Sequence, residues 1–217
     1  MLFLDELPEF GAHKLDTLRQ PLEEGEVRLG RARGFATFPA RFLCVAAMNP
    51  CPCGQWRPEA PCGCSPLAVE RYAGRVSGPL RDRFDLKLAL RAVPVRELQL
   101  GRSEAPAAAG PTSAELRARV IAARQRQLAR QGVPNAELGG AALRQHAGLG
   151  GAEARELDRL ADRYRLSARQ VVRLLRLART AADLEGAERV GAEHLAAVLA
   201  LQRGARLPGS EVSPAAA

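Results

Sequence analysis

Apolar and polar positions follow different patterns in the two halves of the chain. Up to about residue 95, apolar runs of strand length lie at residues 2–4, 42–48 and 84–90 and alternate with short helical stretches. This alternation is typical of an α/β protein. The run at 42–48 is entirely apolar and stops just before Asn49 and a proline, so it predicts a buried strand that the proline terminates.

From residue 113 onward the apolar positions recur with helical spacing. Two capping boxes mark helix starts, because Thr112 precedes Glu115 by three positions and Ser167 precedes Gln170 by the same interval. The pattern predicts three or four helices, over approximately residues 113–131, 152–164, 168–184 and 192–202.

The chain is expected to divide into four parts. Residues 1–100 form an α/β core with a cysteine-rich insertion at 51–64, and residues 113–203 form an all-helical domain. Residues 101–112 (GRSEAPAAAGPT) lack apolar periodicity and contain two prolines and two glycines, which is typical of a linker. Residues 204–217 are expected to be a disordered tail.

Composition excludes several classes of protein. With 47% hydrophobic residues in 217, the chain has enough apolar material for a core, so a disordered or collagen-like protein is excluded. No uninterrupted apolar run exceeds seven residues, whereas a membrane span needs about 20. Asp5 and Glu6 also lie where a signal peptide has basic residues, so we expect a cytoplasmic protein that does not contact membranes.

The charge favours polyanionic partners. The net charge is +8 and the pI is about 10.0, and all basic residues except Lys14 and Lys87 are arginines. Clustered guanidinium groups bind the phosphates of nucleic acids and nucleotides with release of counterions. Aromatic residues make up only 4% of the chain, so a surface for base stacking is not expected.

Four of the five cysteines lie in one short segment. Cys51-Pro52-Cys53 and Cys62-Gly63-Cys64 are separated by eight residues, and four thiolates in two close pairs can form a tetrahedral Zn²⁺ site. The alternative is a cluster of reduced cysteines on a loop. Cys44, within the apolar run, is expected to lie in the core.

Polar residues follow two of the predicted strands. Asp5 and Glu6 come directly after the first apolar run, an arrangement by which nucleotide hydrolases present one acid to Mg²⁺ and another to the attacking water. The alternative is simply a strand that ends in solvent. Asn49 follows the second apolar run, and an amide at the end of a strand can orient water.

Five segments carry a resemblance to one family. They are LFLDELPEF, LDTLRQPLEEGEV, FPARFLCVAAMNPCPCG, SGPLRDRFDL and SARQVVRLLRLAR. In this order they resemble the magnesium-chelatase-like AAA+ ATPases of the YifB/ComM type. The resemblance implies part of a three-layer αβα P-loop NTPase core followed by an all-helical lid. It also implies ATP and Mg²⁺ as ligands, and a hexameric motor for DNA branch migration in natural transformation.

The resemblance also implies roles for individual residues. Asp5 is the Walker B acid in the metal shell, and Glu6 is the general base that polarises water. Asn49 matches the sensor 1 residue, and Arg169 matches the sensor 2 residue that contacts the nucleotide. Arg83 matches the arginine finger, which reaches the γ-phosphate held by a neighbouring subunit.

Three groups of basic residues have simpler explanations as well. For Arg83 the alternative is a salt bridge to Asp82 or Asp85. Residues 25–38 read as a β-hairpin with Arg31 and Arg33 near its tip, which predicts either contact with DNA in the pore or a solvated turn. Arg173 and Arg176, on the same face of the helix at 168–184 as Arg169, are expected to be solvated, and the three histidines are given no role.

A P-loop is absent from the sequence. Neither lysine follows a glycine-rich loop, so the chain resembles the C-terminal part of a longer protein. In the family, the Walker A strand lies between the sensor 1 strand and the strand that residues 84–90 resemble, which implies a gap at the centre of the sheet. Three interpretations stay open: part of a DNA motor, a metal-chelatase motor subunit, or a truncated remnant without catalysis. The cysteine insertion after Asn49 favours the first over the second.

Overall fold

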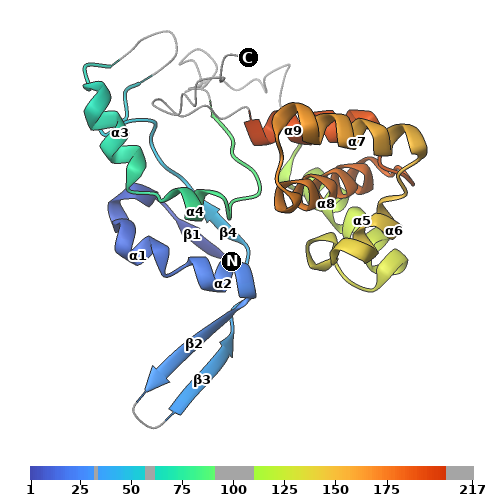
Figure 1. Cartoon of the computed structure of the whole chain (residues 1–217), viewed down its shortest axis with the longest axis horizontal. Coiled ribbons are helices and arrows are strands. Elements are labelled where there is room, and N and C mark those ends of the chain that lie inside the picture. The colour runs from blue at the N-terminus through green and yellow to red at the C-terminus, as the bar shows by residue number, and fades with distance from the viewer. Residues whose placement is uncertain (32–33, 57–61, 91–109, 204–217) are drawn as a thin grey trace. The chain divides into compact units, whose positions relative to one another are not determined.

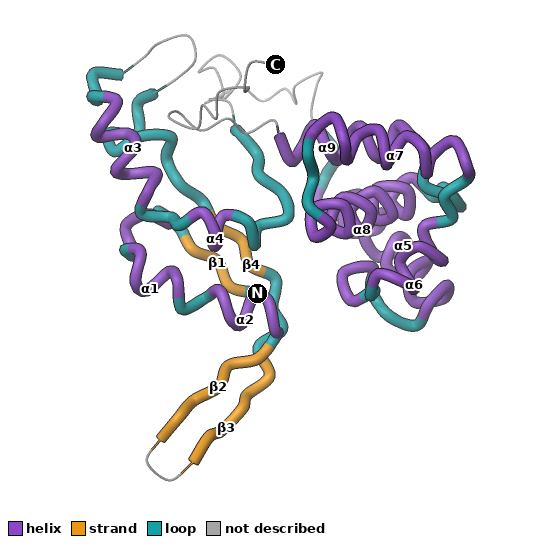
Figure 2. Tube along the Cα trace, viewed as in Figure 1, coloured by secondary structure: helices purple, strands orange, loops and turns teal. Residues whose placement is uncertain are grey.

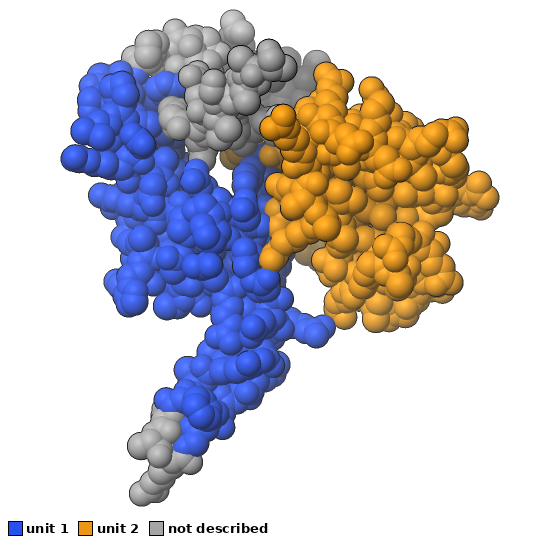
Figure 3. Space-filling model, viewed as in Figure 1, with its two compact units in different colours: residues 1–87, 205–217 blue, residues 88–204 orange. Residues whose placement is uncertain are grey.

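The computed structural model describes residues 1–31, 34–56, 62–90 and 110–203. These residues form two compact units, the first from the described residues up to Lys87 and the second from those that follow (Figure 3). Most of the expected linker, residues 101–109, and the expected tail, residues 204–217, lie outside the described residues. In the described part of the chain no helix has the length and apolar character that a membrane span requires.

The first unit is organised around two parallel strands. Strand β1 (Leu2–Leu4) pairs with β4 (Cys44–Ala46), and Leu4 lies opposite Ala46. Because side chains alternate across a strand, Leu4 is buried on one face while Phe3 and Val45 are exposed on the other. Figure 1 shows this pair with the short helices of the unit around it.

The first unit also contains short helices, some of which cover one face of this sheet. They are η1 (Leu7–Phe10), α1 (Ala12–Asp16), α2 (Arg19–Glu24), α3 (Pro66–Gly74) and α4 (Gly78–Arg81). Ser65 and Ser77 cap α3 and α4, and in both helices a proline occupies the first turn, where its missing N–H costs nothing. The core joins Leu4 to Leu7, Leu15 and Leu80.

Two expectations for this unit are wrong. The run at 42–48 is not a fully buried strand, because only Cys44–Ala46 pair and Leu43 and Val45 are exposed on the sheet face that the described helices leave uncovered. Residues 84–90 form no strand, and Leu88 and Leu90 are exposed. An extended segment becomes a strand only beside a partner, and no described strand lies next to this one.

The hairpin predicted at residues 25–38 is confirmed. Strands β2 (Glu26–Arg31) and β3 (Gly34–Pro39) pair antiparallel, with Glu26 opposite Pro39 and Arg31 opposite Gly34. They form a two-stranded sheet separate from β1 and β4, and every residue of β3 is exposed (Figure 2).

The second unit is helical. It comprises α5 (Ser113–Gln131), η3 (Asn135–Glu137), α6 (Gly140–Ala147), α7 (Gly151–Tyr164), α8 (Ala168–Glu185) and α9 (Ala192–Arg203). The four predicted helices and both capping boxes are confirmed. Helix α6 was not predicted, because it begins after a glycine without a side-chain cap and glycines surround it on both sides.

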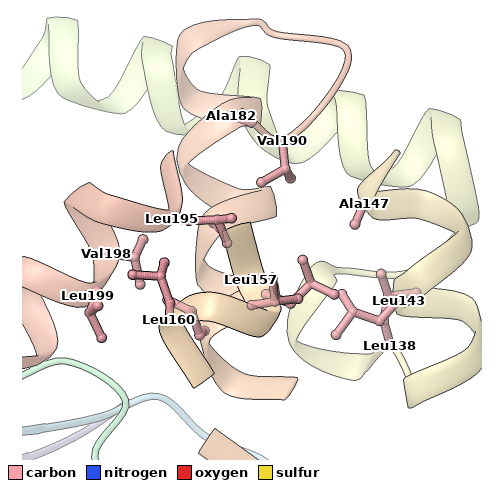
Figure 4. Packing of buried hydrophobic residues seen from close by; sticks show 13 residues of the cluster. Leu138, Leu143, Ala147, Leu157, Leu160, Ala182, Val190, Leu195, Val198 and Leu199 are labelled. Carbon is pink, nitrogen blue, oxygen red and sulfur yellow. The ribbon is translucent and has the colours of Figure 1, made fainter. Parts of the chain in front are cut away.

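Helix α8 is the centre of this unit. It packs against α5, α6 and α9. Leu174 of α8 and Leu195 of α9 are fully buried, and Figure 4 shows Leu195 within the apolar cluster that Leu143 and Leu157 also join. Burial of this many large side chains gives the unit a core of its own.

Candidate functional site

Three of the predicted site residues are brought to one edge of the β1–β4 sheet. Parallel pairing continues past the strands, since Ala47 N–H donates to Leu4 O at 2.9 Å and Leu7 N–H donates to Ala47 O at 2.9 Å. Both strands therefore end together, and Asp5, Glu6 and Asn49 follow these ends. Ligands of open parallel sheets bind at this edge. All three side chains are exposed to solvent.

Glu6 has an unusual backbone conformation. Its φ of 50° and ψ of 45° place it in the left-handed region, where a side chain costs roughly 1–2 kcal/mol. Its N–H donates to Asp5 Oδ1 at 2.9 Å, and its carbonyl accepts from Glu9 N–H at 2.8 Å. Strain of this kind is concentrated at functional sites, and no pattern in the sequence reveals it.

Arg83 is held by groups of its own unit. Its guanidinium forms an ion pair with Glu23 of α2 and donates from Nη1 to Pro79 O at 3.1 Å. The side chain is 15% exposed, and its Nε is buried without a hydrogen-bond partner among the described residues. The alternative considered for Arg83 named only its sequence neighbours Asp82 and Asp85, and no pattern in the sequence pointed to Glu23, which lies 60 residues away.

Arg169 and the arginines that follow it occupy different environments. Arg169 lies in the exposed first turn of α8, two residues after the capping residue Ser167. Arg176, expected to be solvated, instead donates to Leu138 O from Nε at 3.0 Å and from Nη2 at 2.6 Å. This expectation is wrong because the chain before α6 passes beside α8 and presents a carbonyl there.

The cysteines of the insertion gather at one point. The Sγ atoms of Cys51, Cys53, Cys62 and Cys64 all lie within 4.8 Å of one another. Cys51 Sγ is 3.4 Å from Cys53 Sγ and 3.6 Å from Cys62 Sγ. A tetrahedral Zn²⁺ with Zn–S bonds of 2.3 Å separates its sulfurs by about 3.8 Å, so the arrangement fits this metal. Cys44 is half-buried beside the core.

The thiols of this cluster differ in acidity. Burial disfavours ionisation of Cys51, but hydrogen bonds from the Trp56 backbone and from neighbouring groups outweigh it and lower the pKa to about 6. The hydrogen bond with the Cys53 side chain raises the pKa of Cys64 to about 12. Hydrogen bonding within the cluster thus favours the thiolate form of Cys51 and the thiol form of Cys64, and a bound metal would displace protons from the thiols.

Of the two predicted DNA-contacting residues, one is described. Arg31 is the last residue of β2, opposite Gly34. Arg33 lies outside the described residues. The structure therefore places the backbone of Arg31 next to the turn, as the sequence predicted.

A buried polar network in the second unit was not predicted. Asp183, which is almost fully buried, accepts hydrogen bonds from Arg130 at 2.6 Å and 3.0 Å, from Arg179 at 3.0 Å and from Asn135 at 2.8 Å. Arg179 also donates to the carbonyls of Ala187 and Glu188 after the helix. The only signal in the sequence was that Arg179 and Asp183, four residues apart, lie on the apolar side of α8.

His194, given no role from the sequence, is also buried. Its Nδ1 accepts from Gly191 N–H at 2.8 Å, and its Nε2 lies 3.1 Å from Glu185 Oε2. It lines a cavity of about 270 Å³ together with Glu153, Arg189 and Glu193. The imidazole thus joins the start of α9 to the end of α8, which is a structural role.

Comparison with protein families matches nearly all of the chain. Residues 1–98 match the model of the magnesium chelatase subunit ChlI, and residues 110–202 match the model of the C-terminal part of the same subunit. The chain therefore belongs to the magnesium chelatase family. Both the strand-end residues of the first unit and the helices of the second fall within the matched segments.

Within this family the chain is similar to YifB and ComM. It is 43% identical over 195 residues to YifB of Salmonella typhimurium, which covers 90% of this chain and 37% of the relative. It is 40% identical over 207 residues to the competence protein ComM of Haemophilus influenzae, an alignment that covers 95% of this chain and 40% of the relative. It is 41% identical over 212 residues to Rv2897c of Mycobacterium tuberculosis, with the same coverage. The chain thus spans about two-fifths of these relatives.

Proposed function

We propose that the chain is the C-terminal portion of an ATP-driven, hexameric DNA-remodelling motor of the YifB/ComM type. The observation that carries this proposal is that Asp5, Glu6 and Asn49 all follow the carboxyl ends of two adjacent parallel strands. The name of the Haemophilus relative links that protein to competence, which supports a role in natural transformation.

The three residues at the sheet edge would act on the water that attacks the terminal phosphate. Glu6 takes the proton of this water, Asn49 orients it, and Asp5 holds the hydrated shell of Mg²⁺. Mg²⁺, when bound with ATP, neutralises charge on the phosphates. The left-handed backbone of Glu6 supports the assignment, because it directs this carboxylate independently of the strand before it.

The remaining parts of the nucleotide site would come from elsewhere. The sequence contains no P-loop, and the exposed Phe3 and Val45 leave one face of the β1–β4 sheet uncovered among the described residues. Parallel sheets are normally covered on both faces, so these positions favour a longer polypeptide that completes the sheet. Arg83 would then act on the nucleotide of a neighbouring subunit, and Arg169 would contact the nucleotide from the helical lid.

The DNA motor is favoured over a chelatase motor by the cysteine insertion. This insertion lies between Asn49 and Arg83, and in the chelatase subunits the sensor and the finger are expected to follow each other directly. The third interpretation is a remnant without catalysis. It predicts that even a longer form of the protein, with a P-loop, would not hydrolyse ATP. We propose a cytoplasmic location, in accordance with a DNA partner.

Zinc is proposed as a structural ligand of the four cysteines. If they bind it, protein purified under reducing conditions will contain about one Zn²⁺ per chain, because four thiolates complete a closed tetrahedral site. Elemental analysis measures this content. Cys51→Ser combined with Cys53→Ser should remove the metal, whereas Cys44→Ser, outside the cluster, should retain it. Reduced wild-type protein without zinc would contradict the assignment.

DNA binding by the hairpin can be tested with a charge-matched pair of variants. The double variant Arg31→Ala and Arg33→Ala should bind DNA more weakly and reduce the salt slope of binding by about 2, since each phosphate contact contributes about 1. Arg117→Ala with Arg119→Ala removes the same charge from the exposed face of α5 and should leave the slope unchanged. Fluorescence anisotropy across a salt series measures both. Equal slopes in the two double variants would show that the hairpin does not contact DNA.

A further inference from the structure

The turn that carries the first cysteine pair lies against the side chain of Asn49. The turn at residues 51–54 is closed by Gly54 N–H donating to Cys51 O at 3.1 Å, and Gly54 has a φ of 71°. A methyl group at Gly54 would lie 3.5 Å from Asn49 Cγ and 3.6 Å from Asn49 Nδ2, which is van der Waals contact. The amide group of Asn49 therefore rests on the turn that Cys51 and Cys53 hold.

The second cysteine pair leads to a second contact with Asn49. Ser65, next to Cys64, caps α3, and this helix carries Tyr72, which is only 5% exposed. Burial raises the pKa of the Tyr72 hydroxyl, and a hydrogen bond with the backbone of Asn49 opposes this increase. The side chain of Asn49 thus lies against the turn that carries the first cysteine pair. The backbone of Asn49 is hydrogen-bonded to α3, the helix that begins just after the second pair.

We infer that the four-cysteine centre is the element that positions Asn49 at the end of β4. A metal bound to all four sulfurs joins the turn below the amide to the start of α3, and so fixes both supports of Asn49 with respect to each other. Without the metal, the two pairs are eight residues apart in the sequence, and the sulfur contact that the described residues make between them is the 3.6 Å approach of Cys62 Sγ to Cys51 Sγ. The catalytic role of Asn49 rests on the proposed function. The effect of the bound metal on the position of Asn49 does not depend on that function.

The composition of the chain makes this coupling measurable. Asn49 and Asn135 are the only asparagines, so labelling with ¹⁵N-asparagine gives signals from one residue beside the cysteines and one in the second unit. Trp56 is the only tryptophan, and its backbone hydrogen-bonds to Cys51, so its fluorescence reports metal binding. Titration of the reduced, metal-free 217-residue chain with ZnCl₂ follows both signals without nucleotide or DNA.

The backbone and side-chain amide signals of Asn49 should shift with the same midpoint as the Trp56 fluorescence, near half an equivalent of Zn²⁺. Hydrogen exchange of the Asn49 backbone amide should slow by about tenfold or more, while the signals of Asn135 stay unchanged. Zinc binding without any change at Asn49 would overturn the inference. Failure to bind zinc would also overturn it.

A variant of Tyr72 separates positioning from general folding. Tyr72→Phe keeps the ring that packs in the core and removes the hydroxyl. It should bind Zn²⁺ with unchanged stoichiometry and lose most of the slowing of hydrogen exchange at Asn49. If Asn49 in Tyr72→Phe is protected as in the wild type, α3 does not transmit the effect and the inference is wrong. Loss of the proposed ATPase activity would not change either result, because no step of this experiment involves ATP.

Discussion

Glu6→Gln in a P-loop-containing longer form of the protein is expected to lower the rate of ATP hydrolysis by roughly 10²–10⁴-fold, the usual contribution of a general base. Glutamine has the shape of glutamate but cannot accept the proton of the attacking water. Glutamine also adopts the left-handed backbone conformation of residue 6 at a similar cost in free energy, so the stability of the fold should not change. Nucleotide binding should therefore be retained, which steady-state turnover and equilibrium binding of ATP measure separately.

Two controls restrict the interpretation of this result. Glu9→Gln changes a carboxylate of the same segment that pairs with Arg75 at 2.9 Å, and it should leave turnover nearly unchanged. The 217-residue chain alone should hydrolyse essentially no ATP, because none of its described acids or arginines replaces the backbone donors of a P-loop. Normal turnover in Glu6→Gln would exclude the assignment of Glu6 as the base.

Asp183→Ala is expected to destabilise the second unit by about 3–5 kcal/mol, the usual effect of removing one partner from a buried ion pair. The variant leaves Arg179 fully buried with its charge uncompensated, and Arg130 and Asn135 also lose their acceptor. Asp158→Ala removes an exposed carboxylate from α7 and should change stability by less than about 0.5 kcal/mol. Chemical unfolding of the chain, followed by helical circular dichroism, measures the difference; equal stabilities would contradict the role of the network.

The same network predicts how stability responds to acid. Burial opposes ionisation of Asp183, but hydrogen bonds from Arg130 and Asn135 and the charge of Arg179 outweigh burial and hold the pKa of this carboxyl below its usual value. A depressed pKa stabilises the folded state above the unfolded pKa of aspartate, about 3.9, and this stabilisation is lost as the pH falls below that value. The acid-dependent loss should be smaller in Asp183→Ala.

Local interactions allowed several elements to be predicted from the sequence. The starts of α5 and α8 depend on side chains three residues apart, Thr112 with Glu115 and Ser167 with Gln170, so no distant contact is needed to define them. The hairpin of β2 and β3 is local in the same sense. The residues around Asp5, Asn49 and the cysteine pairs could likewise be picked out, because each group occupies a few consecutive positions, and all lie within the segment that matches the magnesium chelatase family.

Contacts between distant residues decided the features that could not be predicted. Residues 84–90 have strand composition but no described neighbour to pair with, and Val45 is apolar but lies on an uncovered face. The pairing of Arg83 with Glu23 joins residues 60 positions apart. Composition and periodicity do not encode which partner a side chain meets after folding, because that depends on the packing of whole elements.

The sequence by itself thus determined the starts of α5 and α8, the β2–β3 hairpin, and the residue types available at the strand ends and in the cysteine pairs. Only the tertiary structure decided that Asp5, Glu6 and Asn49 end at one sheet edge and that the cysteine turn supports Asn49. It also placed the charges of Asp183 and its partners inside the second unit. The physical reason is that capping, turn formation and periodicity act over a few residues, whereas strand pairing and burial act between segments that meet only in the folded chain.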